Sequence, residues 1–269
     1  MTFSDSHCHL DFPALASQNT LITECKTLGV ERIVVPSIGP QNWQAVLSCS
    51  HINDIKVYPA LGIHPWYLDN LNADTLDELA KLVAQHNHQL AAVGEMGIDG
   101  TIAIEWAKKH NDESLKQAHL NRQIEFFQGQ LNLATHYKLP AIVHHRRSHP
   151  EIVAQIKANK FTHGGIIHAF TGSYQQAKQY LDLGFKLGIG GAITYERAKK
   201  TRNAIKRLPL DAFVLETDAP AMPLSGQQGQ DNTPLNIPLI FESLVDLRDE
   251  SRELIAVELE KNLTQALNL

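Results

Sequence analysis

The chain has 269 residues, of which 43% are hydrophobic and 20% charged, which is typical of a folded globular protein. Its net charge of −5 argues against a protein that holds duplex DNA mainly through a basic surface, so any attraction for nucleic acid must be local. The sequence starts without a signal-peptide pattern, no apolar run approaches the roughly 18 residues of a membrane helix, and its three cysteines lack metal-ligand spacing. We therefore expect a cytoplasmic protein with no membrane attachment and no obligatory protein partner.

Short β-branched runs alternate with helical stretches along the whole chain. Strands are expected at 3–9, 31–36, 56–61, 90–94, 141–144, 165–168, 185–188 and 212–216. Strict alternation of strands and helices implies a parallel sheet. Eight such units over roughly 250 residues predict one domain, 1–269, folded as a TIM-type (β/α)8 barrel. An open doubly wound sheet is the alternative, although no glycine-rich phosphate loop follows the first strand.

Several helices have recognisable signals. Thr75 and Glu78 have the spacing of a capping box ahead of an apolar-periodic segment. A C-terminal helix is predicted from one apolar stripe with a four-residue spacing: Ile255, Leu259, Leu263 and Leu267. The long interval 96–137 is expected to hold a loop followed by a long helix.

Good metal ligands follow the predicted strands at their carboxyl ends. They are His7 and His9 on the first strand, Glu95 after the fourth, His144 at the end of the fifth, His168 at the end of the sixth and Asp218 after the eighth. Active sites of such barrels lie at this end, so we expect these side chains to converge. An isolated His-x-His pair is more often structural, but strand side chains alternate, so His7 and His9 face the same side about 6.7 Å apart. The coincidence of the other strand ends favours a metal site.

The types of ligand indicate which ions would bind. The two oxygens of Glu95 can bridge two ions roughly 3.5–4 Å apart. Mixed imidazole and carboxylate ligation suits zinc, manganese, cobalt or nickel and disfavours magnesium. Four neutral imidazoles and two carboxylates around two divalent ions leave a charge of about +2, or about +1 with a bridging hydroxide. Such a centre would attract phosphate although the whole chain is acidic.

The same positions lie in segments that resemble the TatD family of metal-dependent deoxyribonucleases, and its YjjV branch in particular. The matching segments are 7–11 (HCHLD), 62–65 (GIHP), 94–99 (GEMGID), 144–146 (HHR), 168–173 (HAFTGS) and 215–220 (LETDAP), with 190–195 and 222–230 resembling the YjjV branch. The resemblance implies a TIM barrel with divalent metals and DNase activity, often 3′-to-5′ on single-stranded DNA. It also implies one ion held by His7, His9, Glu95 and Asp218, and a second ion held by Glu95, His144 and His168. Departures from the family pattern fall at Met96, Ile98, Ala169 and Thr171, and none is a ligand.

The mechanistic hypothesis is hydrolysis of a phosphodiester by a metal-activated water. Two ions lower the pKa of that water, and Asp218 acts as both ligand and general base. Arg146 stabilises the pentavalent transition state together with the ions, or it is instead a buried ion-pair partner. His64 contacts a phosphate oxygen or the leaving group, or it only shapes a loop. Glu216 is expected to support a ligand rather than bind metal.

Other residues allow a role in binding single-stranded DNA, the expected substrate. Trp66, Tyr67 and Tyr195 can stack on unpaired bases, although loop packing explains them equally well. A run of basic residues could contact the DNA backbone, but a solvated helix face is the favoured interpretation for most of it. The run consists of Arg197, Lys199, Lys200, Arg202, Lys206 and Arg207.

Two alternative functions remain open at this point. An amidohydrolase that opens a cyclic amide, lactone or amine would use the same barrel and similar ligands. Many binuclear enzymes of the amidohydrolase class, which this barrel also resembles, bridge their metals with a carboxylated lysine after the fourth strand. This chain has Glu95 at that place, which favours the nuclease. The second alternative is a metal-binding protein without turnover.

Overall fold

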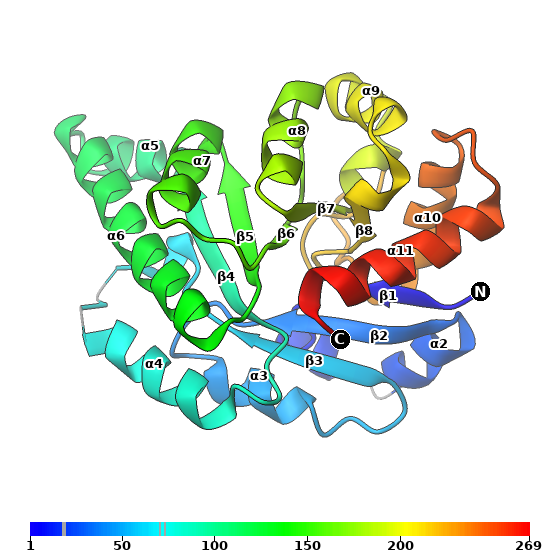
Figure 1. Ribbon diagram of the computed structural model, residues 1–269, viewed down its shortest axis with the longest axis horizontal. Helices are drawn as coiled ribbons and strands as arrows, with labels where there is room; N and C mark the ends of the chain where they lie inside the picture. The colour runs from blue at the N-terminus through cyan, green and yellow to red at the C-terminus, as the bar shows by residue number, and fades with distance from the viewer. Residues whose placement is uncertain (18–19, 70, 73) are drawn as a thin grey trace.

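The computed structural model describes residues 1–17, 20–69, 71–72 and 74–269 and contains an eight-stranded parallel sheet (Figure 1). The strands are β1 (Phe3–Asp5), β2 (Val30–Pro36), β3 (Lys56–Leu61), β4 (Ala92–Asp99), β5 (Ala141–Arg146), β6 (Gly165–Ile167), β7 (Phe185–Ile189) and β8 (Phe213–Leu215). Each strand pairs with the next in chain order. A doubly wound sheet would change direction part-way, so this order excludes it.

Hydrogen bonds between the first and last strand segments bring the two edges of the sheet together. The Ser6 amide donates to the Leu215 carbonyl at 2.8 Å. Beyond the strands, the Asp218 amide donates to His7 O and the His9 amide to Ala219 O, both at 2.8 Å. The sheet is therefore a nearly closed barrel, which confirms the predicted TIM-type fold.

Helices surround the barrel and connect its strands (Figure 1). They are α1 (Pro13–Ala16), α2 (Leu21–Thr27), α3 (Trp43–Cys49), α4 (Asp74–His86), α5 (Gly100–Lys109), α6 (Ser114–Tyr137), α7 (His149–Ala158), α8 (Tyr174–Asp182), α9 (Lys199–Arg207), α10 (Ile237–Val245) and α11 (Arg252–Leu267). Short 3-10 helices are η1 (Pro65–Tyr67), η2 (Gly191–Thr194), η3 (Leu210–Ala212) and η4 (Pro234–Asn236). Within the described part of the chain, none of the helices has both the length and the apolar character needed to cross a bilayer.

A small apolar core fills the inside of the barrel below its carboxyl end. Its strand residues are Val34, Ala60, Ala92, Ile142, Ile166 and Val214. Leu263, Ala266 and Leu267 of α11 pack against these residues. Asn262 of the same helix donates to the carbonyls of Leu210 and Phe213, where β8 begins. Helix α11 thus covers the amino end of the barrel and leaves the carboxyl end for the site.

The predicted apolar stripe of α11 is confirmed, because all four of its residues are buried. The predicted capping box is wrong, since Thr75 is the second residue of α4 and lies inside the helix. Its hydroxyl accepts the amide of Asn72 instead. Two further predictions need correction: the interval 96–137 holds the two helices α5 and α6 where a loop and one helix were expected, and β1 ends at Asp5, before His7.

Strand β4 runs five residues further than predicted, through Glu95 to Asp99. Met96 and Ile98 alternate with polar residues and are buried in the outer core with Phe126 and Phe127. This two-residue periodicity makes the segment a strand. As a consequence, Glu95 and Asp99 lie on the same strand face, toward the barrel centre.

Candidate metal centre

A cavity of about 130 Å³ at the carboxyl end of the barrel is lined by most of the predicted site residues. These are His9, His64, Glu95, His144, His168 and Asp218. His7 is fully buried beside them, with its Nε2 atom 3.1 Å from Glu95 Oε2. All six predicted metal ligands therefore come together in space.

Glu95 lies at the centre of the cluster and divides it into two groups. Its Oε2 atom lies 3.1 Å from His7 Nε2 and 3.8 Å from His9 Nε2. Its Oε1 atom lies 3.0 Å from His144 Nδ1 and 3.9 Å from His168 Nε2. The two groups adjoin, because the His7 and His168 rings stack with centroids 3.5 Å apart. A carboxylate with different imidazoles at its two oxygens has the arrangement expected of a bridging ligand.

The group around Oε2 has donor spacings that fit a metal ion. Asp218 Oδ1 lies 3.6 Å from the Nε2 atoms of both His7 and His9. Ligands at about 2.1 Å from a tetrahedral ion are separated by about 3.4 Å. His7 Nε2 is buried and, among the described residues, forms no well-aligned hydrogen bond although Glu95 Oε2 lies 3.1 Å away, so an ion between these atoms would satisfy it.

Asp218 reaches this position through an unusual backbone conformation. Its φ angle is +59°, in the left-handed region, which aspartate tolerates better than most residues. The bond from its amide to the His7 carbonyl fixes it next to the first histidine pair. The seam of the barrel therefore sets the spacing of His7, His9 and Asp218.

In the second group, each predicted histidine ligand is backed by a carboxylate. His144 Nε2 hydrogen-bonds Asp99 Oδ2 at 3.1 Å, and His168 Nδ1 lies 3.0 Å from Glu216 Oε1. These contacts leave His144 Nδ1 and His168 Nε2 directed toward Glu95. Metal-binding histidines commonly have a carboxylate on the second ring nitrogen, which fixes the tautomer. Glu216 thus occupies the supporting position expected for it.

Asp99 is a site residue that the sequence analysis missed. It is fully buried, and its Oδ2 atom also accepts Trp66 Nε1–H at 2.7 Å. Its Oδ1 atom caps α5 by accepting the amides of Thr101 and Ile102 at 2.7 and 3.1 Å. Burial alone would raise the pKa of Asp99, but the hydrogen bonds from His144 and Trp66 hold this pKa below its usual range. The alternation along 95–99 was the signal that could have revealed it.

His64 is held in a defined tautomer. Its Nδ1 atom accepts the Trp66 amide at 3.0 Å, so a neutral ring carries its proton on Nε2. That nitrogen lies 3.3 Å from Glu95 Oε1 and 3.2 Å from His144 Nδ1. His64 therefore presents an N–H donor to the cavity, which suits contact with a phosphate oxygen better than metal ligation.

Burial and neighbouring charges shift the pKa values of the site strongly. Burial opposes the charged form of His168, yet Glu216, Asp218 and Glu95 together raise its pKa to about 10. Burial raises the pKa of Asp218 to about 7, although His168 acts to lower it. Burial, and then His168, lower the pKa of His7, which keeps its ring neutral and able to ligate. Ligation of an ion by His168 would displace its proton, so metal binding should release protons.

The family model described as TatD-related DNase matches residues 4–268. The chain belongs to the TatD-related DNase family. The metal-dependent hydrolase YjjV of Escherichia coli K12 is 37% identical over 268 residues, covering 99% of this chain and 98% of the relative. A metal-dependent hydrolase of Haemophilus influenzae is 36% identical over 258 residues, covering 95% of each chain. The crystal structure of YjjV superimposes with a TM-score of 0.89 at 36% identity, covering 99% of this chain and 98% of the other.

These relatives make this TatD-family chain a metal-dependent hydrolase and argue against the binding protein without turnover. Its histidine and glutamate residues form clusters that could bind metal. Three groups in the described residues have donor atoms close enough to hold an ion: His7, His9 and Glu95; His7, His168 and Glu216; His64, Glu95 and His144.

The structure places the other predicted residues of this TatD-family hydrolase both inside and outside the metal cavity. Arg146 ends β5 with its side chain exposed, and it does not line the cavity. A buried ion pair is therefore the wrong interpretation of Arg146. Trp66 and Tyr67 line the cavity and are 45% and 40% exposed, whereas Tyr195 borders a neighbouring cavity.

Proposed function

We propose that this hydrolase cleaves phosphodiester bonds, with single-stranded DNA as its substrate, at a centre of two divalent ions. Zinc, manganese, cobalt or nickel suits the ligands better than magnesium. The observation that carries the proposal is the position of Glu95, whose two oxygens contact different histidines. The nuclease family to which the chain belongs supports the same substrate class.

Charge explains how an acidic chain would attract a polyanion. The cluster offers four imidazoles, which are His7, His9, His144 and His168, and two carboxylates, Glu95 and Asp218. With two divalent ions the sum is about +2, buried where water screens it poorly. This local charge favours a phosphodiester over a neutral amide or lactone.

The residues of the chain have separate tasks in this proposal. When bound, the ions would supply a water of lowered pKa and positive charge for the phosphate oxygens. Asp218 lines the cavity and accepts the proton of the attacking water. The Nε2–H of His64 donates to a phosphate oxygen or to the leaving oxygen. Asp99 and Glu216 keep His144 and His168 oriented.

The test is an assay on chelator-treated protein reconstituted with manganese or cobalt. We expect nucleotide release from single-stranded DNA and cleavage of an activated aryl phosphodiester. Hydrolysis of lactones or dihydropyrimidines without cleavage of any phosphodiester would reverse the conclusion in favour of an amidohydrolase. Asp218→Asn serves as the matched variant, since it should keep much of its metal but lose most of its rate.

A further inference from the structure

A second cavity, of about 370 Å³, lies next to the metal cavity. Its lining residues are Ala192, Tyr195, Arg197, Ala198, Met222 and Pro223. Pro220 and Ala221 line the metal cavity, and Met222 and Pro223 line the second cavity. The segment 220–223 after β8 therefore forms a wall of both cavities. Since Ala221 and Met222 are consecutive, their Cα atoms lie about 3.8 Å apart. The two cavities are thus within reach of one extended ligand.

The wall between the cavities is held firmly in place. The Tyr195 hydroxyl donates to the Pro223 carbonyl at 2.8 Å, and the Asn232 side chain donates to the Met222 carbonyl at 3.1 Å. A Cβ atom at Gly191 would lie 2.7 Å from that Met222 carbonyl, so the backbones are in close contact. The cavity is therefore formed before any ligand arrives.

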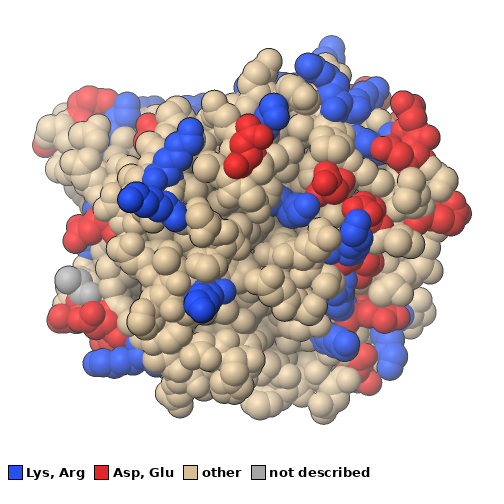
Figure 2. All heavy atoms as spheres, in the orientation of Figure 1, with Lys and Arg blue, Asp and Glu red and all other residues tan. Residues whose placement is uncertain are grey.

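The side chains around the second cavity combine an aromatic ring with positive charge. The Arg197 guanidinium lies 4.7 Å from the centre of the Tyr195 ring, and Arg197 is exposed. Lys199 and Lys200 follow at the exposed start of α9, and Figure 2 shows basic side chains gathered over this helix. Glu196 is the adjacent acidic residue, and it does not line the cavity.

The basic residues between 197 and 207 differ in their surroundings, and some of them have packing contacts away from the second cavity. Arg202 donates to the Ile193 carbonyl, and Arg207 lies over the Tyr174 ring at 4.1 Å. Lys206 is exposed near the end of α9 and does not line the cavity. Of the six residues in the run, Arg197 alone lines the second cavity.

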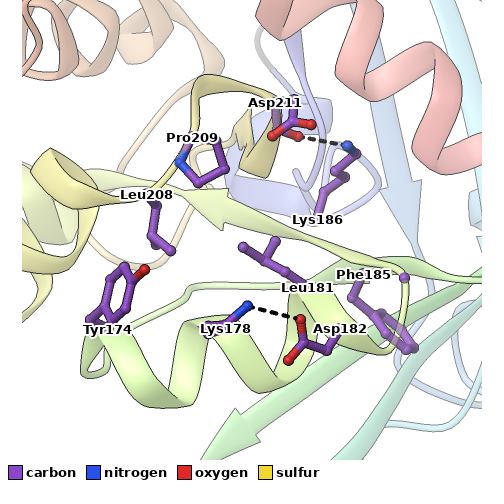
Figure 3. Close-up of a pocket in the computed structure, with 10 residues that line it drawn as sticks. Tyr174, Lys178, Leu181, Asp182, Phe185, Lys186, Leu208, Pro209 and Asp211 are labelled. Carbon is purple, nitrogen blue, oxygen red and sulfur yellow. Dashed lines mark hydrogen bonds and ion pairs between the residues drawn. The ribbon is translucent and has the colours of Figure 1, made fainter.

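A third cavity, of about 310 Å³, has basic residues but a different character (Figure 3). Its Lys178 pairs with Asp182 at 3.3 Å, and its Lys186 donates to the Asp211 carbonyl at 2.6 Å. It also borders Phe185, where β7 begins, at the end of the barrel opposite the metal cavity. This cavity therefore does not adjoin the metal cavity and is not a candidate for a neighbouring subsite.

We propose that the second cavity binds the nucleotide adjacent to the cleaved bond, and this rests on the proposed phosphodiesterase function. The base of that nucleotide packs on the Tyr195 ring and the apolar side chains, while its phosphate pairs with Arg197. Aromatic stacking with a nearby cation is the usual way in which proteins hold single-stranded nucleic acid. The subsite makes the enzyme selective for polynucleotides over small phosphodiesters.

Arg197→Glu tests the phosphate contact, with Lys206→Glu as the control that makes the same charge change on the same helix. The substrates are a single-stranded oligothymidylate and an aryl methyl phosphodiester, whose single phosphate reaches only the metal cavity. We expect Arg197→Glu to raise KM for the oligothymidylate about tenfold. The plot of log affinity for the oligothymidylate against log salt concentration should become less steep in Arg197→Glu, with the magnitude of its slope smaller by about 0.7. The small substrate should be cleaved at the wild-type rate by both variants.

Tyr195→Leu tests stacking, and Tyr195→Phe controls for the lost hydroxyl bond to Pro223. We expect Tyr195→Leu to weaken oligothymidylate binding about tenfold, measured by fluorescence anisotropy, and Tyr195→Phe to have a much smaller effect.

The proposal is overturned if Arg197→Glu and Lys206→Glu weaken oligothymidylate binding equally, or if Arg197→Glu slows the small substrate just as much. Wild-type protein that cleaves no phosphodiester would instead refute the proposed function. In that case the anisotropy measurement still decides separately whether the subsite binds a single strand.

Discussion

Asp99→Asn tests whether the buried carboxylate controls the second metal group. The asparagine oxygen can still accept the amides of Thr101 and Ile102, so the start of α5 is preserved. Its NH2 group then faces two donors, Trp66 Nε1–H and His144 Nε2–H. His144 can relieve this conflict by moving its proton to Nδ1, the atom that faces Glu95. Nδ1 is then no longer able to bind an ion.

The size of the effect follows from these contacts. Loss of the partner that orients a metal-binding histidine typically lowers metal affinity 10–100-fold, which is about 1.4–2.7 kcal/mol. Trp66 is partly exposed, so loss of its hydrogen bond to Asp99 lowers the free energy of unfolding by about 0.5–1.5 kcal/mol. We therefore expect one ion to bind as in the wild type and the other to bind 10–100-fold more weakly.

The assay is a cobalt titration followed by calorimetry and visible absorption. Trp66→Phe is the control, because it removes the same N–H donor without placing a new donor against His144. We expect Trp66→Phe to lose some stability but to keep both metal affinities within a few fold. If Asp99→Asn binds two ions with wild-type affinity, the assignment of Asp99 as the residue that orients His144 is wrong.

Three further predictions follow from the same geometry. Asp218→Asn should reduce kcat by about 10²–10⁴-fold in the phosphodiester assay while metal content changes little, and a full rate would remove Asp218 as the proton acceptor. Removal of both ions by a chelator should abolish activity and lower the midpoint of thermal unfolding by about 10–20 °C, since each ion at 100 times its Kd contributes about 2.7 kcal/mol. An unchanged midpoint would contradict ligation by buried histidines. Gly188→Ala should destabilise the fold by about 1–3 kcal/mol in a denaturant titration, because its Cβ would lie 2.0 Å from Glu216 Oε2. An unchanged midpoint for Gly188→Ala would show that Glu216 moves freely.

The fold was predictable because each buried strand is a short apolar run separated from the next by a helix. Strand ends were less predictable, since β4 continues beyond Gly94 into a segment whose glycines resemble a loop. Gly97 has room only for hydrogen, because a Cβ atom there would lie 2.1 Å from the His144 carbonyl. The glycines here serve close strand packing rather than a turn.

The ligand set was predictable because strand ends of a parallel barrel meet at one place. Asp99 was missed because its role depends on two partners that are distant in sequence, Trp66 and His144. The direction of the Arg146 side chain could not be predicted from the sequence, since the last residue of a strand can face either the cavity or solvent. Contacts of this kind depend on tertiary packing that periodicity does not encode.

The seam between the first and last strand segments has a consequence for assembly. His7 and His9 are synthesised well before Asp218, which lies far later in the chain, yet the backbones of the two segments hydrogen-bond directly across the closing edge of the barrel. The first ion site therefore cannot form before Asp218 has been synthesised, and no metal ion can bind all of its ligands until the first and last strand segments pair. An ion bound there would link the two closing segments, so amide protons along that edge should exchange more slowly in the metal-loaded protein.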